Sequence, residues 1–193
     1  MSKTKNQKQI EALVLGAIFT ALVLVLQLIG SFIRFGNFSV NVVLVPIVLG
    51  AAMCGVGIGT WLGFVSGIAV LLSGDAALFL GFNVPGTIIT VMLKGIACGF
   101  AAGLAYKLLS KYNRYLAVVV AAVACPIVNT GIFTLGCFVF FFEKIGGIAS
   151  SMGFDSAIPT IFIGFIGVNF FLELAANIVL SPVILRVINF KRK

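Results

Sequence analysis

The sequence contains no histidine and only five acidic residues among 193. Histidine-based catalysis and metal ligation are therefore excluded, and no two carboxylates share one face as an acid–base pair requires. The phosphate-binding pattern GxxxxGK[ST] is also missing. Its four cysteines lie singly in apolar segments without a CxxC pair, so we expect buried small side chains rather than zinc ligands or disulfides. These absences argue against an enzyme and predict no cofactor and no metal.

Charge of either sign is scarce as well. Charged residues make up 9% of the chain, whereas a soluble domain carries about 25%. Hydrophobic residues make up 61%. This composition is typical of an all-α membrane protein in contact with the lipid bilayer.

Long apolar runs give the expected architecture. A helix that spans a bilayer requires ~20 apolar residues, and Pro46 predicts that the second span is short or kinked. Residues 73–83, which include Asp75, are predicted to be an outer loop that can contain a short apolar turn, and residues 143–156 a Gly/Ser-rich loop. We predict a single domain, residues 1–193, forming a compact bundle of six transmembrane helices at about residues 10–33, 40–53, 55–72, 84–109, 116–142 and 157–188.

The distribution of lysine and arginine predicts the orientation of this bundle. With six spans, ten of these residues fall on the side that contains both termini and two on the other side. Because positive charge collects in the cytoplasm, both termini are expected there. The net charge of +8 is then an insertion signal in a bacterial plasma membrane, and no nucleic-acid partner is expected.

Glycine recurs at every fourth position in two neighbouring predicted spans. The third span contains Gly55, Gly59, Gly63 and Gly67, and the fourth contains Gly95, Gly99 and Gly103. Residues four apart share one helix face, and a glycine face lets another backbone approach closely. We expect close packing inside the bundle, with a flexible or ligand-facing role as the alternative.

One lysine, Lys94, lies inside a strongly apolar run, with no other charge before Lys107. A cation at mid-bilayer costs at least ~2.5–3.5 kcal/mol, so it tends to face the bundle interior or a wet cavity. An anion is needed beside it. That anion is either a carboxylate of the protein or a bound ligand.

Further polar residues lie at a similar depth. Asn129 and Thr130 are in the fifth span, and Asn169 and Glu173 are one helical turn apart in the sixth. One interpretation is a structural ion pair between Lys94 and Glu173, with amide bonds between helices. The other is a polar pocket that opens outward and binds a ligand. The two can coexist.

Two further sets of residues are candidates. Arg34 and Asn37 follow the first span, where Arg34 either snorkels to the interface or forms a gate or ligand anchor beside Asn37. Ala17 and Ala21 form a small-residue stripe on the first span, which packs either within the chain or against a partner protein.

Taken together, these residues resemble a known family. The segment NFSVNVVLVPIVLGAAMCGVGIGTWLGFVSGIAVL, residues 37–71, is similar to the first outer loop and second and third spans of the S-components of energy-coupling-factor (ECF) vitamin importers. The segment PIVNTGIF, residues 126–133, is similar to the fifth span of the subgroup with the pantothenate and riboflavin S-components. The stripe AIFTA matches the first-helix AxxxA pattern of the family.

The resemblance implies a function. An S-component binds a vitamin from outside, docks through its first helix on a transmembrane coupling subunit with two ATPases, topples, and releases the vitamin inward. Ala17 and Ala21 would then be docking residues, and residues 34–41 the gate. Lys94, Asn129, Thr130, Asn169 and Glu173 are substrate-binding candidates from their depth and not from a family motif.

Pantothenate is the substrate we expect, because Lys94 and Arg34 favour a carboxylate and an ion pair is stronger in a dry site. Riboflavin and folate require aromatic stacking, and most of the nineteen phenylalanines are expected to face lipid. The acidic loop run of riboflavin binders is replaced here by NFSV, residues 37–40. The alternatives are a riboflavin or folate S-component, and a self-contained channel or small secondary carrier. For a carrier, no inverted repeat relates residues 1–96 to 97–193.

Overall fold

The computed structural model describes residues 5–32, 34–35, 38–39 and 42–190. Side chains are described for these residues apart from 5, 8, 31–32, 34–35, 38–39, 168 and 187–190. The elements are α1 (Lys5–Phe32), β1 (Arg34–Phe35), β2 (Phe38–Ser39), α2 (Leu44–Cys54), α3 (Val56–Leu72), α4 (Ala77–Phe82), α5 (Val84–Leu109), α6 (Arg114–Gly136), the π-helical η1 (Cys137–Phe141), α7 (Phe142–Ile148), the 3-10 turn η2 (Ser150–Met152), α8 (Ala157–Pro159), the π-helical η3 (Thr160–Gly167) and α9 (Val168–Phe190).

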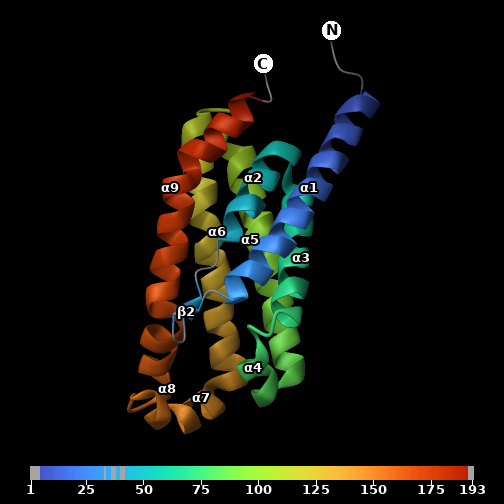
Figure 1. Cartoon of the computed structure of the whole chain (residues 1–193). Helices are drawn as coiled ribbons and strands as arrows, with labels where there is room; N and C mark the ends of the chain where they lie inside the picture. The colour runs from blue at the N-terminus through green and yellow to red at the C-terminus, as the bar shows by residue number, and fades with distance from the viewer. Residues whose placement is uncertain (1–4, 33, 36–37, 40–41, 191–193) are drawn as a thin grey trace.

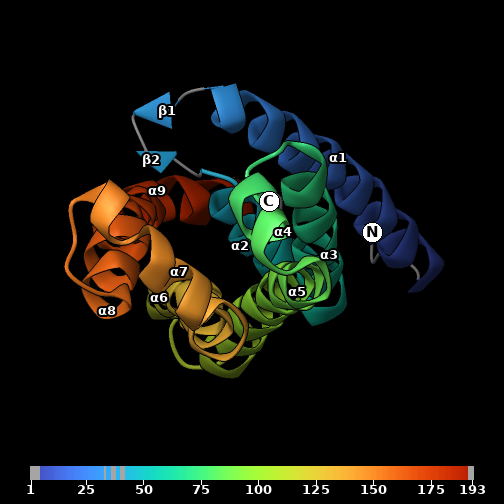
Figure 2. The same ribbon diagram turned by 90° about the horizontal axis from the view of Figure 1, so that it is seen from below.

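The helices form an upright bundle. Helix α1 begins and α9 ends at the same end of the bundle, whereas α4, α7 and α8 lie at the opposite end (Figure 1). Seen along the bundle, α1, α3 and α5 lie on one side and α6 and α9 on the other (Figure 2). The antiparallel pair β1–β2 lies between α1 and α9.

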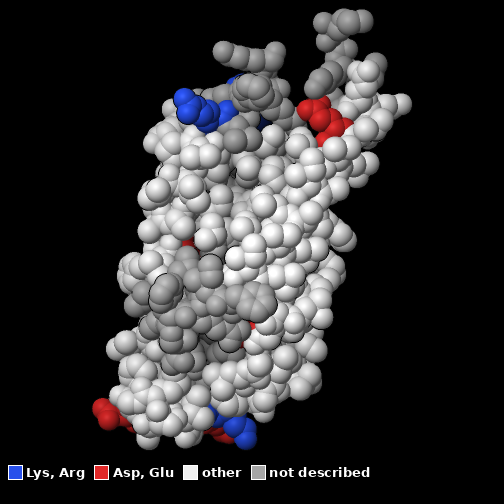
Figure 3. All heavy atoms as spheres, viewed as in Figure 1, with Lys and Arg blue, Asp and Glu red and all other residues white. Residues whose placement is uncertain are grey.

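Within the described residues, four stretches are long and apolar enough to cross a membrane, so the predicted count of six spans stays a prediction. The visible charged side chains gather at the two ends of the molecule, and an almost uncharged band separates them (Figure 3). A multi-pass membrane protein is therefore the class that the helices define. The four stretches are Gln9–Gly30, Val84–Leu109, Arg114–Ile148 and Ala157–Arg186, while α2 and α3 are shorter apolar helices.

The predicted break between the second and third spans is present, but the second helix begins later than residue 40. Helix α2 has 11 residues, which at ~1.5 Å per residue is about half of a ~30 Å hydrocarbon core. Pro46 lies in the first turn of α2. A backbone N–H in that turn makes no hydrogen bond within the helix, so proline, which lacks this group, is tolerated there. Gly55, with φ of 97°, ends α2 and begins α3. This φ suits glycine because it has no Cβ.

The glycine stripes pack α3 against α5, as the first interpretation predicted. A Cβ on Gly63 would collide with the carbonyl oxygen of Gly95, and a Cβ on Gly99 would collide with that of Gly59. The two backbones are therefore in direct contact. In a bilayer the hydrophobic effect does not drive helices together, because lipid tails are as apolar as the side chains. Close packing of this kind then stabilises the helix pair.

The loop predicted at residues 73–83 contains a short apolar helix where the sequence allows an apolar turn, whereas the loop predicted at residues 143–156 is wrong in part because it begins with helix. Residues 77–82 form α4, and the fifth span continues through η1 into α7, up to Ile148. Two glycines in α7 disfavour a helix locally. Burial of Phe141 and Ile145 against Ile161 favours it and decides the outcome.

The main apolar core lies between α1, α2, α3, α5 and α6. Phe19 and Val23 of α1 pack there with Ile47 of α2 and Leu62 of α3. Cys98, Cys125 and Cys137 are buried as expected, whereas Cys54 is only partly buried. Because this core fills the half of the bundle nearest the start of α1, the other half is left to enclose a cavity.

Candidate functional site

A cavity of about 550 Å³ lies in the half of the bundle that contains α4 and α7. Its walls come from α1, α3, α4, α5, α6, α7, η3 and α9. Segments far apart in the sequence therefore meet around it. Five of the residues predicted to bind a ligand line this cavity: Lys94, Asn129, Thr130, Asn169 and Glu173.

Lys94 is partly buried in the middle of α5. Its ammonium lies over the ring of Phe133, with Nζ 5.4 Å from the ring centroid. This is a cation–π contact, which gains strength where water is excluded. Among the residues that the structure describes, no carboxylate oxygen lies within 4.0 Å of Nζ. Lys94 thus lines the cavity without a direct ion pair to any described carboxylate.

Glu173 of α9 lies in the same cavity and is close enough to interact electrostatically with Lys94. Its carboxylate also interacts with the side chain of Asn129, which is buried in α6. A direct ion pair between Lys94 and Glu173, the first interpretation above, is thus replaced by two opposite charges that face a shared space. Such a site can hold a ligand between the charges, or balance them when no ligand is bound.

Asn169 lies one turn before Glu173 on α9, and its Oδ1 is buried without a hydrogen-bond partner in the described part of the chain. Thr130 of α6 lines the cavity and is partly buried. An unpaired buried acceptor is costly in a protein interior. Its presence in the wall of a cavity indicates that this wall suits a polar ligand.

The predicted gate is only partly described. Asn37 lies outside the described residues, and of Arg34 only the backbone is described, in β1. Arg34 is opposite Ser39 of β2 in the antiparallel register. Of this segment only the strands β1 and β2 are placed, between α1 and α9 (Figure 2), and the Arg34 side chain is outside the description.

The predicted docking stripe lies on the outside of the molecule. Ala17 and Ala21 are both exposed on α1, whereas Phe19 and Val23 face the core. The large apolar residues Val14, Ile18, Leu22 and Val25 surround the two alanines on the same exposed side.

Sequence reasoning missed several polar residues of the cavity. Neither Gln27 nor Asp75 is among the residues that the sequence predicts to bind a ligand. The signal was present for Gln27, since an amide in an apolar helix requires a polar neighbour. The residues missed are Gln27 of α1, Asp75 between α3 and α4, and Thr87 and Thr90 of α5.

Several phenylalanines belong to the site as well. Among those with described side chains, five are exposed and two, Phe19 and Phe141, are buried. Phe79 of α4 lies in the centre of a cluster, 5.3 Å from Phe133, 5.2 Å from Phe141 and 5.4 Å from Phe165 between ring centroids. With Phe170, these rings form an apolar wall of the cavity.

The side chains of the cavity are suited to binding a ligand by non-covalent contacts. One cation, two carboxylates, amides and hydroxyls face an aromatic wall, an arrangement suited to one small polar molecule with an apolar part. Within the described residues, no group of three or more histidine, cysteine or acidic side chains could hold a metal ion.

A bundle of apolar helices around such a cavity is typical of a multi-pass membrane protein. The family model "ECF transporter, substrate-specific component" matches residues 11–185. The chain therefore belongs to this family, whose members are parts of transporters and not enzymes. No curated protein and no solved structure matches the chain.

Proposed function

We propose that this protein binds a small water-soluble vitamin in the cavity around Lys94 and delivers it to an ECF module for import. The observation that carries the proposal is the meeting of Lys94, Asn129, Thr130, Asn169 and Glu173 around one cavity of about 550 Å³. A pocket of 300–1,000 Å³ with few polar groups on apolar walls is typical of small-molecule sites.

The proposed topology has six spans with both termini in the cytoplasm of a bacterial cell. Under this orientation the cavity lies in the outer half of the membrane, because α4 and α7 lie at the end away from the start of α1. A vitamin then enters from outside. The excess of lysine and arginine at the cytoplasmic side supports this arrangement.

Delivery requires a partner, because the sequence has no phosphate-binding loop to use ATP. We propose that the exposed α1 face with Ala17 and Ala21 docks on the transmembrane coupling subunit, which carries two ATPase subunits. Small side chains allow two membrane helices to approach closely, and both alanines are accessible on α1.

Pantothenate is the substrate we propose first. It carries one carboxylate, which Lys94 can receive because no protein carboxylate within the described chain lies within 4.0 Å of its ammonium. Its hydroxyl and amide groups suit the amides and hydroxyls of the walls.

A second candidate is an aromatic vitamin, either riboflavin or folate. The observation that favours it is the wall formed by Phe79, Phe133, Phe141, Phe165 and Phe170. Ring pairs with centroids 4.5–7 Å apart attract one another beyond simple area burial. A flat ring system placed against this wall would gain the same contacts.

Thermal unfolding of the purified protein in detergent tests the proposal. Pantothenate, riboflavin and folate are added separately, and the substrate is expected to raise the midpoint by several degrees. Ligand at a hundred times its Kd stabilises a folded protein by about 2.7 kcal/mol. If no vitamin shifts the midpoint and the protein in liposomes conducts ions, a self-contained channel replaces this proposal.

A further inference from the structure

Gln27 is the polar member of the otherwise apolar buried side of α1. That side consists of Gly16, Phe19, Val23 and Gln27, each three or four residues after the one before. Only 3% of Gln27 is exposed, and its side chain lines the cavity. An amide buried to this degree must either pair with the protein or serve a ligand.

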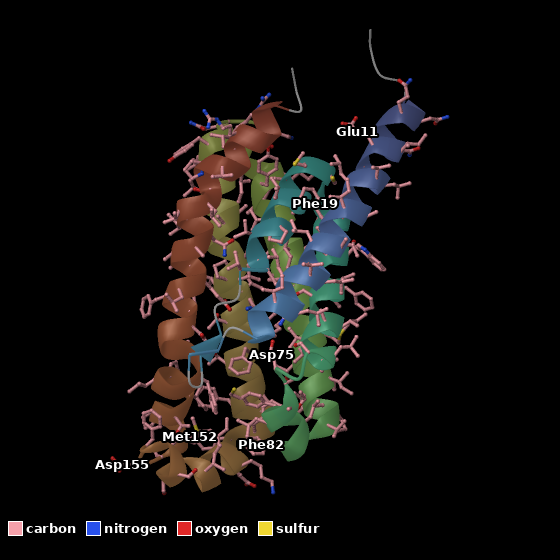
Figure 4. All side chains as sticks on the ribbon, viewed as in Figure 1. Glu11, Phe19, Asp75, Phe82, Met152 and Asp155 are labelled. Atoms are coloured by element: carbon pink, nitrogen blue, oxygen red, sulfur yellow. The ribbon has the colours of Figure 1, made fainter. Side chains whose placement is uncertain are left out.

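One end of the Gln27 amide is fixed by the protein. Nε2 donates a hydrogen bond to Oδ2 of Asp75, 2.7 Å away, and the same oxygen accepts a bond from Oγ of Ser73 at 3.1 Å. Figure 4 shows Asp75 beside the end of α1 that faces α4. Because a carboxylate accepts and does not donate, the nitrogen of the amide must face Asp75.

The other end of the amide is therefore an acceptor, and it is unused. Oε1 of Gln27 is buried without a partner among the described residues. Two other side chains that line the cavity also have a buried oxygen without a hydrogen-bond partner among the described residues: Thr90 through Oγ1 and Asn169 through Oδ1. Three buried oxygens without partners thus lie on three helices around a single cavity.

We propose that Gln27 binds the substrate, its Oε1 accepting a hydrogen bond from a hydroxyl or N–H group, and that Asp75 is the positioning residue that sets the direction of this amide. The inference rests on the proposed function and adds a requirement to it: the substrate presents a hydrogen-bond donor to α1. Pantothenate, riboflavin and folate all carry such donors.

Helix α1 has both of its proposed roles on opposite sides. Ala17 and Ala21 lie on the exposed side of α1, and Gln27 lies on its buried side at the cavity. A substrate bonded to Gln27 is thus in contact with the helix proposed to dock, with no intermediate side chain between them.

The experiment measures the Kd of pantothenate, riboflavin and folate by isothermal titration for the wild type and three variants. Gln27→Met keeps the length of the side chain but removes the acceptor, and we expect affinity to fall about tenfold to a hundredfold. In Asp75→Asn the new amide can either accept from Nε2 of Gln27 or donate to its Oε1, so the direction of the Gln27 amide is no longer fixed. We expect a smaller loss of affinity than in Gln27→Met.

The double variant separates positioning from direct contact. If Asp75 acts through Gln27, the affinity of Gln27→Met/Asp75→Asn equals that of Gln27→Met alone. An additional loss in the double variant overturns the positioning role. Ser181→Ala is the control, since Ser181 is also a buried polar side chain of a helix but is not among the described cavity-lining residues. Its Kd should equal that of the wild type.

Two failures can be told apart. If the wild type binds a probe and Gln27→Met binds it equally well, Gln27 is not a binding residue, while the proposed function stands. If the wild type binds none of the three probes, the proposed function is wrong and the role of Gln27 falls with it.

Discussion

Lys94 shows how a single charge determines the chemistry of this cavity. The ammonium lies over Phe133 and faces a space that also contains Glu173. Neither neighbour neutralises it by direct contact, because no carboxylate of the described chain is within 4.0 Å. A ligand carboxylate would meet a partly dehydrated cation there, and an ion pair is stronger when water is excluded.

We expect Lys94→Met to abolish measurable binding of an anionic vitamin and to leave the fold intact. Removing one partner of a buried charge pair costs about 2–5 kcal/mol, which corresponds to a loss of about thirtyfold or more in affinity. Methionine keeps the unbranched stem and suits the apolar surroundings. Isothermal titration with pantothenate measures the effect.

Lys144→Met is the control for this change, because Lys144 is exposed on α7 and does not line the cavity. Its affinity should match that of the wild type. Unchanged affinity in Lys94→Met would assign Lys94 to structure alone.

At the scale of the helices, the pair α3–α5 is joined by glycine. Backbone contacts at Gly59, Gly63, Gly95 and Gly99 hold the two helices at a distance that no side chain permits. Since α5 carries Lys94 and Thr90, this packing positions two walls of the cavity.

We expect Gly63→Ala to destabilise the protein by about 1–3 kcal/mol, because the new methyl group would force the α3 and α5 backbones apart. The melting midpoint of the purified variant measures this loss. The matched control is Gly57→Ala, at an exposed position of α3 where a Cβ meets nothing within 4 Å. That variant gains helix propensity of up to about 1 kcal/mol. Equal midpoints for both variants would show that the glycine contact is not required.

The two proposed functions, substrate binding and docking on a partner, involve different parts of the molecule. The cavity lies inside the half of the bundle with α4 and α7, whereas the exposed face of α1 lies outside. A change on that face can therefore alter delivery without altering binding.

We expect Ala17→Leu to bind the vitamin with wild-type affinity and to lose most of its uptake, because the larger side chain obstructs close approach of a partner helix. Uptake of radiolabelled vitamin into cells that express the ECF module measures delivery, and titration of the purified variant measures binding. Ala175→Leu, a change at an exposed alanine of α9, should retain both activities. Normal uptake by Ala17→Leu would remove the docking proposal.

The sequence by itself determined the class of the protein and the polar side of its site. Apolar runs and one buried lysine can be read locally, because the cost of transferring a side chain into lipid depends mainly on that side chain. For the same reason the sequence alone indicates Lys94, Asn129, Asn169 and Glu173 as candidates for binding a ligand. Their role in binding remains a prediction, whereas their meeting at one cavity is a property of the fold.

Only the tertiary structure decided which apolar side chains face inward. Lipid and protein core are equally apolar, so a membrane helix carries little record of its buried side. That Phe79, Phe133 and Phe165 form one wall of the cavity therefore follows from the fold and not from the sequence. Gln27 and Asp75, 48 positions apart, became one hydrogen-bonded pair only because the fold brings the end of α1 against the turn after α3.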